Sequence, residues 1–170
     1  SDTARRAAGK LTALWMRGND VLSSDVMAPA VSYQRIRHII AGYEFYQSSL
    51  SPDEQSIIVS GTMNHLYPLK RILQSSNDSI DLLHIAASIL MIGMITGMPA
   101  YDINTVLKQM DQAVQRVVLV DGGPITRRPS DLPDLLKIFV ELRHVFETAA
   151  IPVPSFIAHA IDKMAPALRA

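Results

Sequence analysis

The side chains best suited to chemistry are five histidines, and they are scattered along the chain. No two of them stand three or four residues apart, the spacing that places two imidazoles on one face of a helix. The sequence therefore shows no local set of metal ligands. In chain order they are His38, His65, His84, His144 and His159. His84 adjoins the most apolar segment, where a neutral, hydrogen-bonded imidazole is a commoner role than a ligand or a pH switch.

The usual short motifs of catalysis are missing as well. The chain has no glycine-rich phosphate loop, no His-Glu-x-x-His and no Gly-x-Ser-x-Gly. It has no cysteine, which excludes disulfides, thiolate metal sites, iron–sulfur clusters and a cysteine nucleophile. We therefore expect a protein that is not an enzyme and that binds no cofactor or metal. The alternative is an enzyme or small-ligand pocket lined by His84 or tyrosines, because catalytic groups can converge from distant positions.

Basic side chains form three clusters that are candidates for contacts with phosphate. They comprise Arg5, Arg6, Lys10 and Arg17, then Arg35 and Arg37 beside His38, and then Arg127 and Arg128. On one common face, with Tyr43 or Tyr46 close enough to stack on a base, they would form a nucleic-acid-binding surface. A solvated surface is the simpler interpretation, because the 16 Lys and Arg residues balance 16 Asp and Glu residues.

The element expected to organise the others is the apolar stretch of residues 80–98. After His84 its only polar side chains are Ser88 and Thr96, so a helix here is predicted to be buried on nearly all sides. We predict this helix over about residues 78–97, between an Asn-Asp-Ser start and a Gly-x-Pro end. A membrane span is the alternative, but the run is shorter than the about 20 apolar residues that a bilayer requires.

Two glycines in this predicted helix are candidates for a close contact. Gly93 and Gly97 stand four residues apart, so on a helix they form a flat strip that another helix can approach. The neighbouring helix is expected to belong to the same chain. The alternative is a subunit contact, because most soluble oligomers are symmetric assemblies built from self-complementary patches.

The remaining segments predict an all-α fold of six or seven helices. Apolar residues at helical spacing indicate helices over residues 1–22, 32–47, 51–66, 101–120, 131–149 and 155–168. The clearest start is Ser51-Pro52-Asp53-Glu54, which combines an N-cap serine, a proline at the first helical position and a capping box. Pro68 is expected to end or kink the third helix and to leave residues 69–73 as a short further turn.

The length of 170 residues fits one compact domain with one core, residues 1–170. Residues 1–22 are expected to be loosely packed or ordered only by a partner, because Gly9 and Gly18 each weaken a helix by about 1 kcal/mol relative to alanine. No apolar run of signal-peptide length follows the N-terminal arginines, which predicts a non-secreted, cytoplasmic protein without a membrane span.

These observations favour a non-enzymatic helical interaction or assembly module whose partner is another protein or a second copy of the chain. Self-association into a homo-oligomer is its simplest form. The alternative is an RNA-binding or nucleocapsid or matrix type of helical protein that uses the arginine clusters, with binding that weakens steeply as salt rises.

Overall fold

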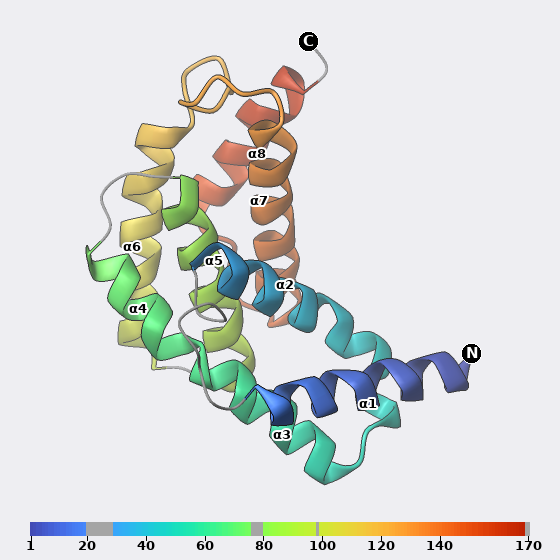
Figure 1. Cartoon of the computed structure of the whole chain (residues 1–170). Coiled ribbons are helices and arrows are strands. Elements are labelled where there is room, and N and C mark those ends of the chain that lie inside the picture. Colours follow the sequence, from blue (N-terminus) through green and yellow to red (C-terminus); the bar gives the residue numbers. More distant parts are fainter. Residues whose placement is uncertain (20–28, 76–79, 98, 169–170) are drawn as a thin grey trace. The chain divides into compact units, whose positions relative to one another are not determined.

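The computed structural model describes residues 1–19, 29–75, 80–97 and 99–168 (Figure 1). The regular secondary structure in these ranges is helical, which confirms the predicted all-α class; the one strand-like pairing there is an isolated bridge between Val118 and Pro124. None of the described helices is both long and apolar enough to cross a membrane. The helices in the described ranges are α1 (Asp2–Gly18), α2 (Pro29–Tyr46), the 3₁₀ helix η1 (Gln47–Ser49), α3 (Pro52–Asn64), α4 (Leu66–Ser75), α5 (Ile80–Thr96), α6 (Ala100–Val117), α7 (Asp131–Thr148) and α8 (Ser155–Ala167).

These helices form two compact units, residues 1–74 and residues 75–170, which we call the N-terminal unit and the C-terminal unit. The expectation of one 170-residue domain stays a prediction. The balanced charge of the whole chain conceals a difference between the units. The N-terminal unit contains eight Lys and Arg and six Asp and Glu residues, a net charge of +2, and the C-terminal unit contains eight and ten, a net charge of −2.

In the N-terminal unit, α1 packs against α2, η1 and α3. Its buried residues are Gly9, Ala13 and Met16, a narrow stripe at the spacing of one helix face. Ala13 belongs to a buried apolar cluster with Tyr46, Leu50 and Ile58. The contact is made by small or flexible side chains, so the neighbouring elements approach α1 closely.

Two glycines mark the closest approaches in this unit. A Cβ atom added at Gly9 would lie 2.5 Å from Leu50 Cδ2, and one added at Gly61 of α3 would lie 2.6 Å from Met16 Sδ. Glycine weakens a helix relative to alanine, as the sequence predicts for Gly9. In the structure, each of the two glycines makes room for a side chain of a neighbouring element.

Gly9 and Gly18 are therefore expected to respond in opposite ways to substitution. Gly9→Val should destabilise the N-terminal unit by about 1–3 kcal/mol, because the added side chain overpacks the contact with Leu50. Gly18→Ala, at a position with no atom within 4 Å of the added Cβ, should be neutral or stabilising by up to about 1 kcal/mol. Urea unfolding followed by fluorescence of the chain's single tryptophan, Trp15, measures both. Equal destabilisation by the two variants would contradict this packing.

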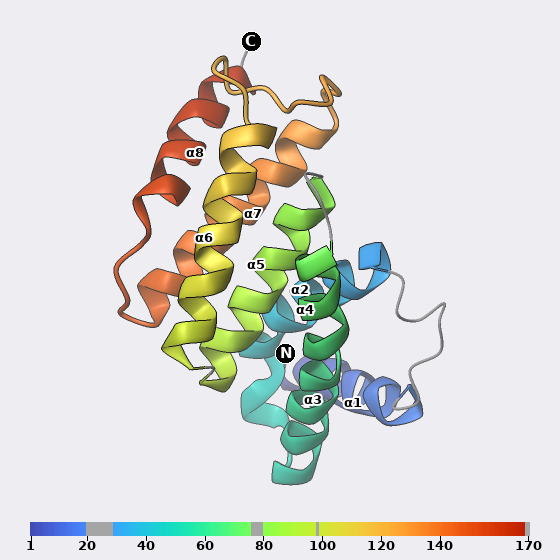
Figure 2. The same cartoon turned by 90° about the vertical axis from the view of Figure 1, so that its left-hand side faces the viewer.

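The C-terminal unit contains α5, α6, α7 and α8, which lie side by side in Figure 2. Every side chain from Leu82 to Ile92 of α5 is at most 7% exposed, and α5 packs against α6 and α7. The long apolar run therefore contributes to the core of this unit. Its role as the centre of the whole chain stays a prediction.

The start of α3 agrees with its prediction in detail. The Ser51 N–H donates to Glu54 Oε2 at 2.8 Å, and the Glu54 N–H donates to Ser51 Oγ at 3.3 Å, so the capping box is closed. The predicted end at Pro68 is wrong. The chain turns at His65, and Pro68 lies in the first turn of α4, where a missing N–H costs no intrahelical bond. The expected short turn is thus the helix α4.

Three other predicted boundaries need correction. Pro29, expected in a loop, begins α2, because its fixed φ suits a first helical position. Ser155 is the first helical residue of α8 rather than its cap. The helix α6 ends at Val117 instead of 120, because the chain becomes extended at Val118 and folds back on itself. That turn is closed by N–H···O bonds from Ile125 to Val117 (2.7 Å) and from Leu119 to Gly123 (2.9 Å).

Candidate protein-binding groove

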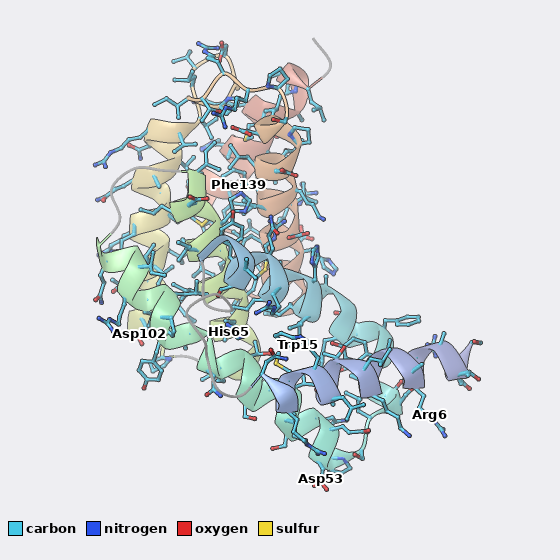
Figure 3. All side chains as sticks on the ribbon, in the orientation of Figure 1. Arg6, Trp15, Asp53, His65, Asp102 and Phe139 are labelled. Atoms are coloured by element: carbon cyan, nitrogen blue, oxygen red, sulfur yellow. The ribbon has the colours of Figure 1, made fainter. Side chains whose placement is uncertain are left out.

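An apolar groove of about 920 Å³ lies between α1 and α2 within the N-terminal unit. One face of each helix forms its walls, as the spacing of the lining residues shows. They are Leu11, Thr12, Leu14 and Trp15 from α1, and Val31, Gln34, Arg35, His38, Ile39 and Tyr46 from α2. Figure 3 shows Trp15 on the side of α1 that faces α2.

The groove exposes large apolar side chains on α1. Leu11 is 67% exposed and Leu14 is 61% exposed, while Trp15 is partly buried beside them. Leu11, Leu14 and Trp15 stand at helical spacing in the sequence, but the two leucines do not lie on the face of α1 that the unit buries. The unit instead buries the Gly9, Ala13 and Met16 stripe, so the leucine stripe is left on the surface.

Two arginines lie over aromatic rings of this unit. The Arg35 guanidinium carbon lies 4.3 Å from the centre of the Trp15 ring, and that of Arg5 lies 5.6 Å from the centre of the Phe45 ring. Both are cation–π contacts, and they hold the arginine side chains against α1 and α2. Burial lowers the pKa of Arg35 from its ordinary value.

Tyr46 is a buried residue of the α2 wall, and it belongs to the same apolar cluster as Ala13 of α1. Its hydroxyl donates to the Ile39 carbonyl at 3.2 Å, and its ring meets that of Tyr43 edge to face, with 5.8 Å between the centres. Burial is the largest cause that raises the pKa of Tyr46, so the hydroxyl stays protonated at neutral pH. Tyr46 is thus a structural residue of the groove, and its ring is not free to stack on a base.

Lys10 and Arg17 lie on another side of α1, near the start of α3. Together with Ala13, Leu14 and Glu54 they line a second, smaller cavity of about 220 Å³. Hydrogen bonds with Ser51 are the main cause that lowers the pKa of Glu54, and the charges of Lys10 and Arg17 add to it. Part of the basic charge of α1 therefore faces a carboxylate.

The third arginine cluster belongs to the C-terminal unit, in the loop between α6 and α7. Arg127 forms an ion pair with Asp121, and this contact is the first cause that lowers the pKa of the Asp121 carboxyl. In the N-terminal unit, Arg37 is only 9% exposed. Of the predicted contacts, Arg5, Arg6, Lys10, Arg17, Arg35 and Arg37 share the N-terminal unit, whereas Arg127 and Arg128 do not belong to it.

The two glycines predicted for a close contact have different environments. Gly93 is buried within α5. Gly97 lies directly after the helix with φ +71°, a conformation that glycine adopts easily, and it ends α5 as the sequence predicts. The helical strip is therefore interrupted at Gly97, and a subunit contact through these residues stays a prediction.

His65 is the histidine with the most constrained setting. It is 2% exposed, and its Nδ1 atom has no hydrogen-bond partner. Burial is the main cause that lowers the pKa of His65, and the positive charge of Arg35 lowers it further. His84 is also buried, and its backbone carbonyl accepts a bond from Ser88 Oγ at 2.9 Å.

The lowered pKa of His65 predicts a pH-dependent stability. Because the unfolded chain takes up a proton near the ordinary pKa of about 6.5 and the folded chain does so only at lower pH, stability is complete above about pH 6.5 and declines as the pH falls toward the lowered pKa. The His65→Leu variant should show a smaller decline between about pH 7.5 and 5.5. Urea unfolding of both proteins, with His38→Gln as an exposed control, measures this difference. Identical slopes for wild type and His65→Leu would contradict it.

In the described ranges no group of three or more His, Asp or Glu side chains is placed to hold a metal ion. Comparison with protein-family models, with curated proteins and with solved structures gave no significant match to this chain.

The class that the fold defines is a helical protein with an open apolar groove. The groove itself could not be found from the sequence, although one signal was present: α1 has more apolar positions than one buried face can hold.

Proposed function

We propose that the chain is a non-enzymatic helical interaction module and that the groove between α1 and α2 is the surface on which another protein chain binds. The single observation that carries this proposal is the exposure of Leu11 and Leu14 beside a concave apolar surface. Exposed apolar patches next to a groove are typical of surfaces that meet a partner. Trp15 and Arg35 are of the residue types that contribute most to binding at such surfaces.

Self-association is the simplest form of this function, but the charge of the groove walls disfavours it at this site. The helices α1 and α2 together carry six Lys and Arg residues and only two acidic residues, Asp2 and Glu44. Two copies that met groove to groove would bring charges of the same sign together, which costs binding energy. A different protein chain is therefore the favoured occupant.

RNA binding is the second candidate, and the excess of basic residues on α1 and α2 favours it. Three contacts count against it. The Arg35 guanidinium covers Trp15, the ring best placed to stack on a base, and Lys10 and Arg17 lie beside Glu54. In addition, aliphatic side chains form much of the groove, whereas nucleic-acid surfaces gain affinity mainly from phosphate contacts.

Photo-crosslinking tests this proposal. The chain is made in cells of its natural source with a light-activated phenylalanine analogue in place of Leu14, or in place of Val120, a control residue that is more exposed than Leu14 and lies outside the N-terminal unit. The proposal expects a discrete protein adduct from position 14, identified by mass spectrometry, that is absent from position 120 and disappears when Leu11 is changed to serine. An adduct with RNA, or the same adducts from both positions, would overturn it.

A further inference from the structure

The shape of the groove fits a helix. Its α2 wall runs from Val31 to Tyr46. Between these ends, Arg35 lies four residues after Val31, and His38 and Ile39 lie three and four residues after Arg35, so one face of α2 lines the groove. At a rise of 1.5 Å per residue this wall is about 22 Å long, which matches a helical segment of about four turns. Pairing with an extended strand is not available here, because both walls are helices whose backbone groups are already bonded.

The charge around the groove indicates which polar residues the bound helix carries. Among the described residues that line it, Arg35 and His38 are basic and none is Asp or Glu. Arg5 lies on the same pair of helices, over Phe45. The chain as a whole has no net charge, so the excess of basic residues on α1 and α2 is a local feature. Complementary charge would speed the encounter with a partner and fix its register.

We infer that the groove between α1 and α2 receives an amphipathic helix of a partner protein, with aliphatic residues toward Leu11, Leu14 and Ile39 and with acidic residues toward Arg35 and His38. This inference rests on the proposed function, because it names the chemical class of the partner for the same surface. The anchors of such a helix recur at i, i+3 or i+4, and i+7, and the flanking positions carry Asp or Glu.

A displayed peptide library tests the partner class. A library of helix-compatible peptides of about 15 residues is selected on the 170-residue chain. Every recovered peptide is then measured on wild type and on the Leu11→Ser/Leu14→Ser variant. This variant should fold, because both leucines are largely exposed and surface changes cost little stability. Far-ultraviolet circular dichroism checks its helix content.

The expected peptides are acidic and amphipathic, and they bind the double serine variant at least about tenfold more weakly than wild type. The charge-reversed variant Arg35→Glu/His38→Glu should bind the same peptides about tenfold more weakly than wild type does. It should still bind basic analogues of these peptides, in which Lys replaces Glu. Groove-dependent peptides that are neutral or basic would overturn the partner class and leave the proposed function standing.

Other outcomes would overturn both ideas or name another occupant. Peptides that bind wild type and the double serine variant equally, or the recovery of none, would remove the groove as a protein-binding site. A dimer seen by sedimentation velocity that dissociates in the double serine variant would make a second copy the occupant and overturn the acidic helix. The acidic helix would also be overturned if wild type bound a single-stranded RNA oligonucleotide instead of peptides and the double serine variant did not.

Discussion

Replacing Phe139 by alanine is expected to cost about 3–5 kcal/mol of the stability of the C-terminal unit. Phe139 is on α7, labelled in Figure 3, and its side chain is completely buried. Removal of the ring takes away its burial and leaves a cavity that a packed helical core fills only in part. The neighbouring residue of the same helix provides a matched control, because Val140 is 40% exposed and its change to alanine should cost less than about 1 kcal/mol.

Urea unfolding followed by far-ultraviolet circular dichroism measures both variants of α7. Trp15 fluorescence in the same titration reports separately on the N-terminal unit. A loss for Phe139→Ala no larger than the loss for Val140→Ala would mean that this side of α7 does not pack as described.

Replacing Gly122 by alanine is expected to cost about 2–4 kcal/mol. Gly122 has φ +82°, where a side chain is strained, and an added Cβ would lie 2.1 Å from the backbone oxygen of Lys163 on α8. The clash is with backbone, so no rotation of a side chain can relieve it. The loop between α6 and α7 would have to separate from α8.

The adjacent glycine provides the control for this prediction. A Cβ at Gly123 would meet only the side chains of Asp121 and Arg127, at 3.2 Å and 3.4 Å, and both side chains are exposed. Gly123→Ala should therefore cost less than about 1 kcal/mol. Urea unfolding gives the free energy of unfolding of each variant. Equal values for Gly122→Ala and Gly123→Ala would contradict the close contact between the loop and α8.

Local signals in the sequence predicted most helix positions, because each depends on a few neighbouring residues. The capping box at Ser51 needs only Glu54 three residues on, and the turn after α5 needs only Gly97. The end of α6 was missed because it depends on a backbone pairing across a turn, between Val118 and Pro124, which apolar spacing does not reveal.

The groove could not be predicted for a different physical reason. On α1 two stripes compete for burial, one with Leu11 and Leu14 and one with Gly9, Ala13 and Met16. The leucine stripe has the larger apolar area, which favours its burial. The smaller stripe, however, lets Leu50 and Gly61 of α3 approach α1 closely, and this close packing favours burial of the smaller stripe. The choice depends on shapes contributed by elements far along the chain, so spacing within α1 cannot settle it.

The basic clusters illustrate the same limit. Their residue types are visible in the sequence, but their surroundings are not. Arg35 lies over Trp15, and Arg127 is paired with Asp121, so each of these cations has a specific local contact. A pattern of arginines alone therefore does not show which of them face a carboxylate and which lie over an aromatic ring.

The central claim is that a partner chain occupies the groove, and Trp15 tests it most directly because it is the chain's single tryptophan and lines the groove. The measurement is acrylamide quenching of Trp15 fluorescence in the free chain and in the chain bound to its crosslinking partner or to a selected acidic peptide. We predict that binding lowers the quenching constant by about half or more, because a helix in the groove excludes the quencher from the indole. An unchanged quenching constant in the bound state would contradict the account.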